Sequence, residues 1–227
     1  MSIKEIREKV FKKEEDIFAY PLRYISTMIT NFLIKTSITS LQITWIHLIL
    51  GIISAVLFGF GNYILTIVAF IIYIISMILD FVDGEIARYK NTRSEVGVWL
   101  DHVSDNILLF LLVAGISIGE FQITKDSSIL ILALIALVIT ASIGVINISK
   151  RTSKKMKQIK AVVLPIKLKY IEKTHVGIFV LSSLILIIGP LIKQVGIVLI
   201  IYIIITFLAM IKSFVNRIDL IKKEFNE

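Results

Sequence analysis

Four aspartates near the middle of the chain have the residue type and spacing best suited to chemistry. Asp80 and Asp83 stand three positions apart and Asp101 and Asp105 four positions apart, each pair in a strongly apolar stretch. On helices, these spacings put each pair on one face. An Asp at mid-membrane costs roughly 2.5 to 3.5 kcal/mol on insertion scales, so four of them predict a functional pocket that holds compensating cations.

Divalent metal ions suit such a pocket. Carboxylates this close repel one another and mostly protonate unless a cation joins them, and ligation by oxygen alone favours Mg²⁺ or Mn²⁺. The chain has no Cys, which excludes thiolate metal sites, iron–sulfur clusters and thiol nucleophiles. Two ions held by four carboxylates is the simplest arrangement. With Arg88 nearby, this arrangement favours phosphoryl transfer, in which metal ions stabilise the phosphate charge and a carboxylate accepts a hydroxyl proton.

The elements that position these residues are predicted to be membrane helices. The chain has 227 residues, 56% of them hydrophobic, and a formal net charge of +8, and this apolar content exceeds what a soluble domain of that size can bury. The 44 residues from Thr36 to Leu79 carry no formal charge, which is about twice the ~20 residues that cross a bilayer as a helix. Two glycines and an Asn within residues 59–62 permit a tight reversal, so this stretch predicts two spans.

The whole chain predicts an all-α integral membrane protein with six transmembrane helices, preceded by an N-terminal amphipathic interfacial helix. Apolar residues recur at helical spacing between Leu22 and Leu33, which indicates the interfacial helix, with a seventh, weakly hydrophobic span as the alternative. The predicted parts are an N-terminal segment with the interfacial helix (1–36), a membrane domain (37–217) and a tail (218–227). The predicted spans are 43–59, 63–88, 95–119, 127–149, 174–192 and 194–212.

Basic residues predict the orientation of this bundle. Of the 25 Lys and Arg residues, 23 fall on one side of the predicted spans, and only Lys125 and Lys193 on the other. The positive-inside rule therefore predicts a multi-pass protein of the cell membrane with both termini in the cytoplasm. At ~1.5 Å per residue, Asp80 lies about 12 Å along its helix from Arg88, so the aspartate pocket is predicted to be shallow and to face the cytoplasm.

The aspartates also belong to a longer motif. It reads Asp80-Phe-Val-Asp83-Gly84-Glu-Ile-Ala87-Arg88, followed after eight residues by Gly97, then by Asp101 and Asp105. This resembles the complete signature of the CDP-alcohol phosphotransferases, D-x2-D-G-x2-A-R-x8-G-x3-D-x3-D, a family of six-helix membrane enzymes of phospholipid synthesis. Every fixed position of the signature is present over these 26 residues. The helix count and the orientation extend the resemblance over most of the chain.

The resemblance implies a reaction and roles for individual residues. A substituted phosphate, phosphatidyl or archaetidyl, would pass from a CDP-linked lipid to the hydroxyl of a small polar alcohol, and CMP would leave. Asp80, Asp83 and Asp101 would hold Mg²⁺ or Mn²⁺, and Asp105 would be the base that deprotonates the acceptor and would share a metal ion. The CDP portion would be bound by Gly84, Arg88 and Ser94. The alternative for Ser94 is a helix N-cap, and for Arg88 an interfacial anchor.

Cations at the ends of the fourth and sixth predicted spans are the candidates for binding an acceptor phosphate. They are Lys150, Arg151, Lys212 and Arg217, and topological anchoring is the alternative for all four. His47 could face the site but is interpreted as a neutral histidine packed within the bundle. No histidine is expected to be a primary Mg²⁺ ligand, because hard cations prefer oxygen ligands.

Two departures from the family pattern leave the acceptor open. Of the Pro-Asn-x-x-Thr sequence that many members carry before the first span, only Thr44 is present. The residue after the fourth Asp is Asn106. At this position, family members whose acceptor is glycerol phosphate tend to have Lys, and members whose acceptor is inositol phosphate tend to have Arg. An inositol phosphate, a glycerol phosphate and serine therefore all stay candidate acceptors.

Two other functions compete with this one. The same reaction could use a soluble CDP-alcohol as donor and a lipid as acceptor, and intramembrane carboxylates also occur in divalent-cation transporters. The expected partners are the donor, the acceptor and the lipid bilayer, with a homodimer implied by the resemblance and no nucleic acid.

Overall fold

The computed structural model describes residues 20–160 and 169–225. Among these, side chains are described for all but 20, 147–160, 169–179, 216, 217 and 219–225. The predicted all-α class is confirmed, because the described residues form helices and no strand. The helices are α2 (Tyr20–Leu33), α3 (Ser40–Gly59), α4 (Tyr63–Tyr89), α5 (Glu95–Thr124), α6 (Ser128–Lys160), α7 (Lys169–Leu191) and α8 (Val195–Phe225).

Five of these helices contain segments long and apolar enough to cross a membrane. These are α3, α4, α5, residues Ser128–Ile146 of α6 and residues Val195–Val215 of α8. Helix α7, at the place of the fifth predicted span, has a shorter apolar segment, Val180–Leu191, among the described side chains. Helix α2 has 14 residues, or about 21 Å at ~1.5 Å per residue, which is too short for a hydrocarbon core of about 30 Å. Within the described residues, α2 therefore matches the predicted interfacial helix.

Three helices extend beyond the predicted membrane spans. The spans predicted to end at 119, 149 and 212 continue as helix to Thr124, Lys160 and Phe225. Hydropathy marks where a chain leaves lipid, but a helix continues into water when its residues favour helix. The segment that extends α6 is rich in Lys, with one Arg and one Gln, all of which have high helix propensity.

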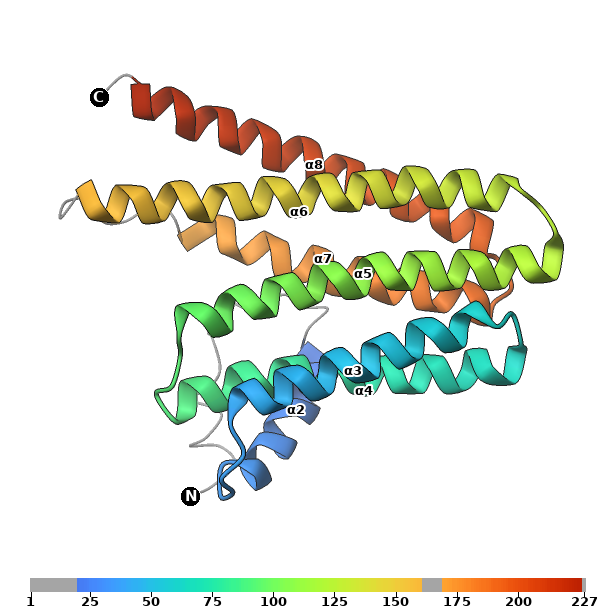
Figure 1. The fold of residues 1–227 in the computed structure, drawn as a ribbon, viewed down its shortest axis with the longest axis horizontal. Helices are drawn as coiled ribbons and strands as arrows, with labels where there is room; N and C mark the ends of the chain where they lie inside the picture. The colour runs from blue at the N-terminus through green and yellow to red at the C-terminus, as the bar shows by residue number, and fades with distance from the viewer. Residues whose placement is uncertain (1–19, 161–168, 226–227) are drawn as a thin grey trace.

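Short connections make α3, α4 and α5 neighbours. Between α3 and α4, Gly61 has a φ of 63°, and the Asn62 side chain caps α4 by accepting hydrogen bonds from the backbone N–H groups of Ile64 and Leu65 at 2.9 and 3.2 Å. The reversal predicted at residues 59–62 is therefore confirmed. Between α4 and α5, Asn91 adopts a φ of 54°, which Asn tolerates better than most residues. Consecutive helices consequently run antiparallel (Figure 1).

Helix α3 packs against both helices that carry the aspartates. Its contact with α5 is close because Gly51 lies under the side chain of Leu108, and Gly115 of α5 lies against the backbone carbonyl of Ala55. Its contact with α4 includes a hydrogen bond of 2.7 Å from the hydroxyl of Ser54 to the carbonyl oxygen of Ala69. These contacts fix the backbones of α4 and α5 relative to one another.

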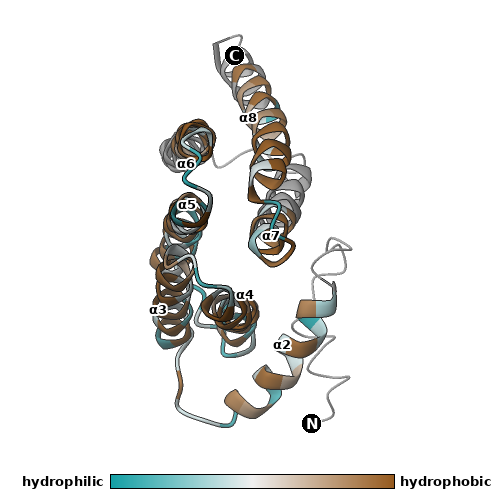
Figure 2. Ribbon diagram, turned by 90° about the vertical axis from the view of Figure 1, so that its right-hand side faces the viewer, coloured by the Kyte–Doolittle hydropathy of each residue, from teal (hydrophilic) through white to brown (hydrophobic). Residues whose placement is uncertain are grey.

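The two ends of the bundle differ. The turn between α4 and α5 lies at the same end as the carboxyl ends of α6 and α8, whereas the α3–α4 and α5–α6 connections lie at the opposite end (Figure 1). Helix α2 is inclined to the long helices and contacts α4, and apolar residues predominate along α3 to α6 (Figure 2). The alternation of connections expected from the basic residues is therefore present.

The α3–α5 contact can be tested with two alanine variants. Gly115→Ala would place a Cβ against the backbone carbonyl of Ala55, which cannot rotate away, so we expect a loss of about 1 to 3 kcal/mol, the usual cost of overpacking. In the control, Gly59→Ala, the nearest atom would lie 3.8 Å from the new Cβ. Thermal unfolding in detergent measures both variants, and equal melting temperatures would contradict this packing.

Candidate active site

The structure brings the four predicted aspartates together between α4 and α5. One carboxylate oxygen from each of Asp80, Asp101 and Asp105 lies within 4.8 Å of the other two. A second group of ligand atoms, from Asp80, Asp83 and His47, meets the same limit. Asp80 belongs to both groups, so the two groups join into one continuous cluster.

One oxygen of this cluster has the environment expected of a metal ligand. The Oδ1 atom of Asp80 is buried and accepts no hydrogen bond from the described residues. A buried acceptor without a partner is costly unless a cation or another donor satisfies it. The surrounding donor set is mostly carboxylate oxygen, which suits Mg²⁺ or Mn²⁺ better than softer metals. The residues therefore fit the divalent ions predicted from the sequence.

Thr44 of α3 orients one of the aspartates. Its hydroxyl donates a hydrogen bond of 2.6 Å to Oδ2 of Asp83, and both side chains are buried, with 5% exposed in each case. A hydrogen bond to an ionised carboxylate stabilises the charged form and fixes its direction. The sequence does not reveal this role of Thr44, because no local pattern indicates a partner that lies on another helix.

His47 of α3 also belongs to the site. It is buried, and its Nε2 atom lies 3.3 Å from the hydroxyl oxygen of Ser104 and 3.8 Å from Oδ1 of Asp80. Its backbone carbonyl accepts a hydrogen bond of 2.8 Å from the hydroxyl of Ser76, which holds α3 against α4. His47 is therefore both packed within the bundle and directed at the aspartates.

A small cavity lies beside two of the aspartates. Its volume is about 10 Å³, and a space of that size holds one water at most. It is lined by both metal-site and apolar residues: His47, Tyr73, Ser76, Met77, Asp80, Phe81, Asp105, Leu108 and Val180.

Gly84 and Arg88 form one unit on α4. A Cβ atom on Gly84 would lie 3.3 Å from Nη1 of Arg88, closer than most Cβ contacts. The Arg88 guanidinium therefore lies over the bare backbone of Gly84, one turn earlier in the helix. This arrangement places the planar guanidinium, a fork of hydrogen-bond donors, beside a backbone position that carries no side chain. Such a combination is suited to a phosphate group.

Ser94 caps α5. Its hydroxyl oxygen accepts a hydrogen bond of 3.0 Å from the backbone N–H of Gly97, as the N-cap alternative predicted. The absence of a side chain at Gly97 favours this contact, because a Cβ there would lie only 3.2 Å from the same hydroxyl oxygen. Ser94 is exposed at the turn, so contact with a donor nucleotide stays a prediction. The side chains of the acceptor candidates Lys150, Arg151 and Arg217 lie outside the described residues.

Known proteins with a similar fold and a similar sequence profile exist. A search among curated proteins gave no match. Among solved structures, the fold is similar to that of a phosphatidylinositol phosphate synthase from Mycobacterium tuberculosis, solved with CDP-DAG bound. The TM-score is 0.62 at 16% sequence identity, and the similarity covers 84% of this chain and 92% of that one.

The family comparison is more specific. The sequence profile of the CDP-alcohol phosphatidyltransferases matches residues 33–214, which include all four aspartates, Gly84, Arg88 and Ser94. The match covers most of the chain, as expected from the helix count and the orientation. The chain therefore belongs to the CDP-alcohol phosphatidyltransferase family, and it is a membrane transferase of substituted phosphate groups that acts in phospholipid biosynthesis.

Proposed function

We propose that this protein transfers a phosphatidyl or archaetidyl group from a CDP-linked lipid to a small polar alcohol, and that CMP is released. The acceptor classes are inositol phosphates, glycerol phosphates and serine. The observation that carries the proposal is the cluster of four carboxylates beside the Gly84–Arg88 unit. A diphosphate needs cations and directed donors close together, and this end of the site supplies places for both.

The proposed cofactor is a pair of divalent ions, either Mg²⁺ or Mn²⁺. Asp80, Asp83 and Asp101 would hold the ions, with Asp105 as a further ligand. Asp80 would be the central ligand, because it belongs to both groups of ligand atoms. Bound there, the ions would neutralise charge on the transferring phosphate and on the leaving CMP.

The protein residues would then act on the two substrates. Arg88 would bind the diphosphate through its guanidinium, and Gly84 would leave the backbone open to it. Asp105 would accept the proton of the acceptor hydroxyl as that oxygen bonds to the β-phosphorus. The bond from this phosphorus to the bridging oxygen breaks, and the bridging oxygen leaves as part of CMP.

The site is proposed to face the cytoplasm. The α4–α5 turn shares its end of the bundle with the carboxyl ends of α6 and α8 (Figure 1), and the connections at that end carry most of the Lys and Arg residues. The positive-inside rule places such an end in the cytoplasm, where soluble acceptors and CMP are accessible.

The acceptor and the donor can be identified in one assay. Purified protein with Mg²⁺ or Mn²⁺ and CDP-diacylglycerol, or its ether-lipid counterpart, is expected to release CMP with one member of a panel of inositol 1-phosphate, glycerol 3-phosphate, inositol and serine. Release with a soluble CDP-alcohol and a lipid acceptor, but with no member of the panel, would reverse the donor and acceptor assignments. No release with either type of donor would contradict the proposed reaction.

Two aspartate variants test the division of roles. Asp105→Asn should lower turnover by about 10²- to 10⁴-fold, the usual contribution of a general base, and should leave binding of the CDP-lipid measurable. Asp80→Asn should weaken binding of both Mn²⁺ and donor, because Asp80 belongs to both ligand groups. Steady-state CMP release and donor titration measure these effects, and wild-type turnover by Asp105→Asn would remove the base assignment.

A third variant tests the hydrogen bond between α3 and the metal site. Thr44→Val removes the donor to Asp83, and loss of such an outer partner usually weakens metal affinity by about 10- to 100-fold. Thr44→Ser retains the hydroxyl and is the matched control. Mn²⁺ binding can be followed by electron paramagnetic resonance. The role of Thr44 is refuted by a valine variant that binds Mn²⁺ as tightly as the serine variant.

A further inference from the structure

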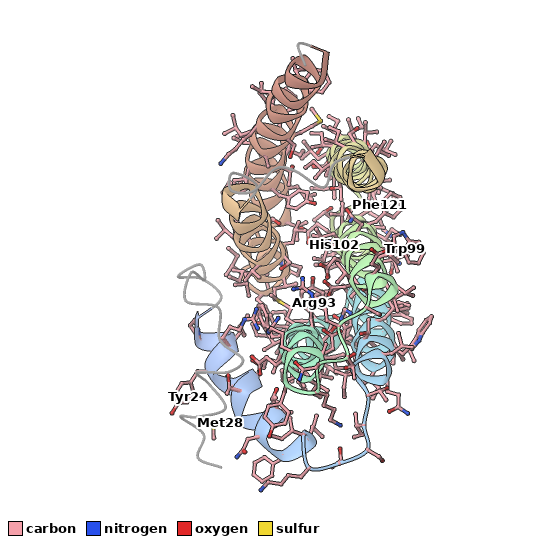
Figure 3. All side chains as sticks on the ribbon, turned by 90° about the vertical axis from the view of Figure 1, so that its left-hand side faces the viewer. Tyr24, Met28, Arg93, Trp99, His102 and Phe121 are labelled. Atoms are coloured by element: carbon pink, nitrogen blue, oxygen red, sulfur yellow. The ribbon has the colours of Figure 1, made fainter. Side chains whose placement is uncertain are left out.

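Helix α2 turns its buried hydroxyl groups toward the protein, together with the partly buried Leu22, Ile29 and Leu33, and turns a second apolar face outward. Ser26, Thr27 and Thr30 are fully buried. The outward side chains are between 43% and 71% exposed: Tyr24, Ile25, Met28 and Phe32. Figure 3 shows Tyr24 and Met28 directed away from α4. The outer face therefore suits lipid, and the inner face makes polar contacts with the protein.

Those polar contacts converge on one carboxylate, that of Glu85 on α4. Its Oε1 atom accepts hydrogen bonds from the Ser26 hydroxyl at 2.7 Å and from Nη1 of Arg23 at 3.4 Å. Its Oε2 atom accepts one of 2.6 Å from the Thr30 hydroxyl. The Glu85 side chain has no exposed surface. Three donors spaced along one face of α2 thus hold a buried negative charge that the proposed reaction does not use.

Arg23 makes a second contact with the same stretch of α4. Its guanidinium lies over the ring of Phe81, with the Cζ atom 4.4 Å from the ring centroid. Phe81 is one helical turn before Glu85, and it lines the small cavity together with Asp80 and Asp105. Arg23 therefore contacts two successive turns of α4 directly behind the metal-site residues.

A buried Arg–Glu pair is poor evidence for stability. Apolar residues of similar volume are often equally or more stabilising, because the ions lose their hydration on burial. What the polar contacts add is direction, since hydrogen bonds of fixed geometry permit one rotation and one register of α2 on α4. The segment from Asp80 to Arg88 carries half of the aspartates and the Gly84–Arg88 unit, so its rotation decides where these groups point.

We propose that Glu85 is a positioning residue: the contacts of Arg23, Ser26 and Thr30 with it clamp the lipid-facing helix α2 to α4 and fix the metal-binding and donor-binding face of α4 toward α5. The expected effect of this clamp on turnover rests on the proposed function. Its effect on metal binding is a separate readout, measured with Mn²⁺ alone.

Two threonines on the inner face of α2 form a matched pair for the test. Thr30→Val removes a donor to Glu85. Thr27→Val removes an equally buried hydroxyl that donates instead to the Arg23 carbonyl oxygen of its own helix, at 2.8 Å. We expect Thr30→Val to weaken Mn²⁺ binding about 10-fold or more, as for other residues that orient metal ligands, and Thr27→Val to leave it unchanged. Electron paramagnetic resonance on the full-length protein in lipid nanodiscs measures both.

A double variant separates positioning from folding. Arg23→Met with Glu85→Leu replaces the ion pair with apolar side chains, and we expect it to keep a melting temperature close to that of the wild type. It should nevertheless show the same 10-fold or greater loss of Mn²⁺ affinity, because the directional contacts are gone. A double variant with wild-type Mn²⁺ affinity, or equal Mn²⁺ affinities in Thr30→Val and Thr27→Val, would overturn the clamp.

Failure of the clamp can be told from failure of the proposed reaction. If the wild type releases CMP but the threonine variants do not differ, the clamp is wrong and the reaction stands. If the wild type releases no CMP but the Mn²⁺ affinities differ as expected, the reaction is wrong and the clamp stands. A wild-type protein that binds no Mn²⁺ would overturn both.

Discussion

Four carboxylates confined to a small volume between two apolar helices are the constraint on which the rest of the structure depends. Two unit charges 4 Å apart repel by about 4 kcal/mol at an effective dielectric constant of 20, and a whole domain is stable by only about 5 to 15 kcal/mol. Several such repulsions within one cluster cannot be sustained by packing alone. Cations must therefore accompany the charged form of the site. Of the neighbouring residues, Thr44 contacts Asp83, His47 lies beside Asp80, and Arg88 lies beside Gly84.

The remaining helices hold this cluster in place. The tight turn after α4 and the Ser94 cap of α5 bring the two aspartate pairs together. Helix α3 packs against α5 through glycine contacts and against α4 through a hydrogen bond from Ser54, and it supplies side chains that reach two of the carboxylates. Helix α2 contacts the opposite side of α4 through Glu85. Helix α4 thus contacts α3 through Thr44 and His47 and α2 through Glu85, and it also packs against α7.

The sequence alone predicted the features that local spacing determines. Asp80 and Asp83 share a helix face because they are three positions apart, and the reversal at Gly61 and Asn62 follows from their backbone preferences. It could not predict pairs that are distant along the chain, such as Thr44 with Asp83, 39 positions apart, or Thr30 with Glu85, 55 positions apart. The periodicity of α2 indicated an amphipathic helix, but in a membrane either face of such a helix can meet the protein. The hydroxyl groups of α2 face inward because they donate hydrogen bonds to the buried Glu85, which the sequence of α2 alone does not reveal.

The central claim, that the aspartate cluster is a divalent-metal site serving a CDP-linked substrate, is tested most directly by calorimetric titration of Mn²⁺ into the purified protein with and without CDP-diacylglycerol. Two ions per chain are expected at saturation, with tighter binding when the CDP-lipid is present, because the diphosphate and the carboxylates would share the ions. A protein that binds no Mn²⁺ under either condition would contradict the account.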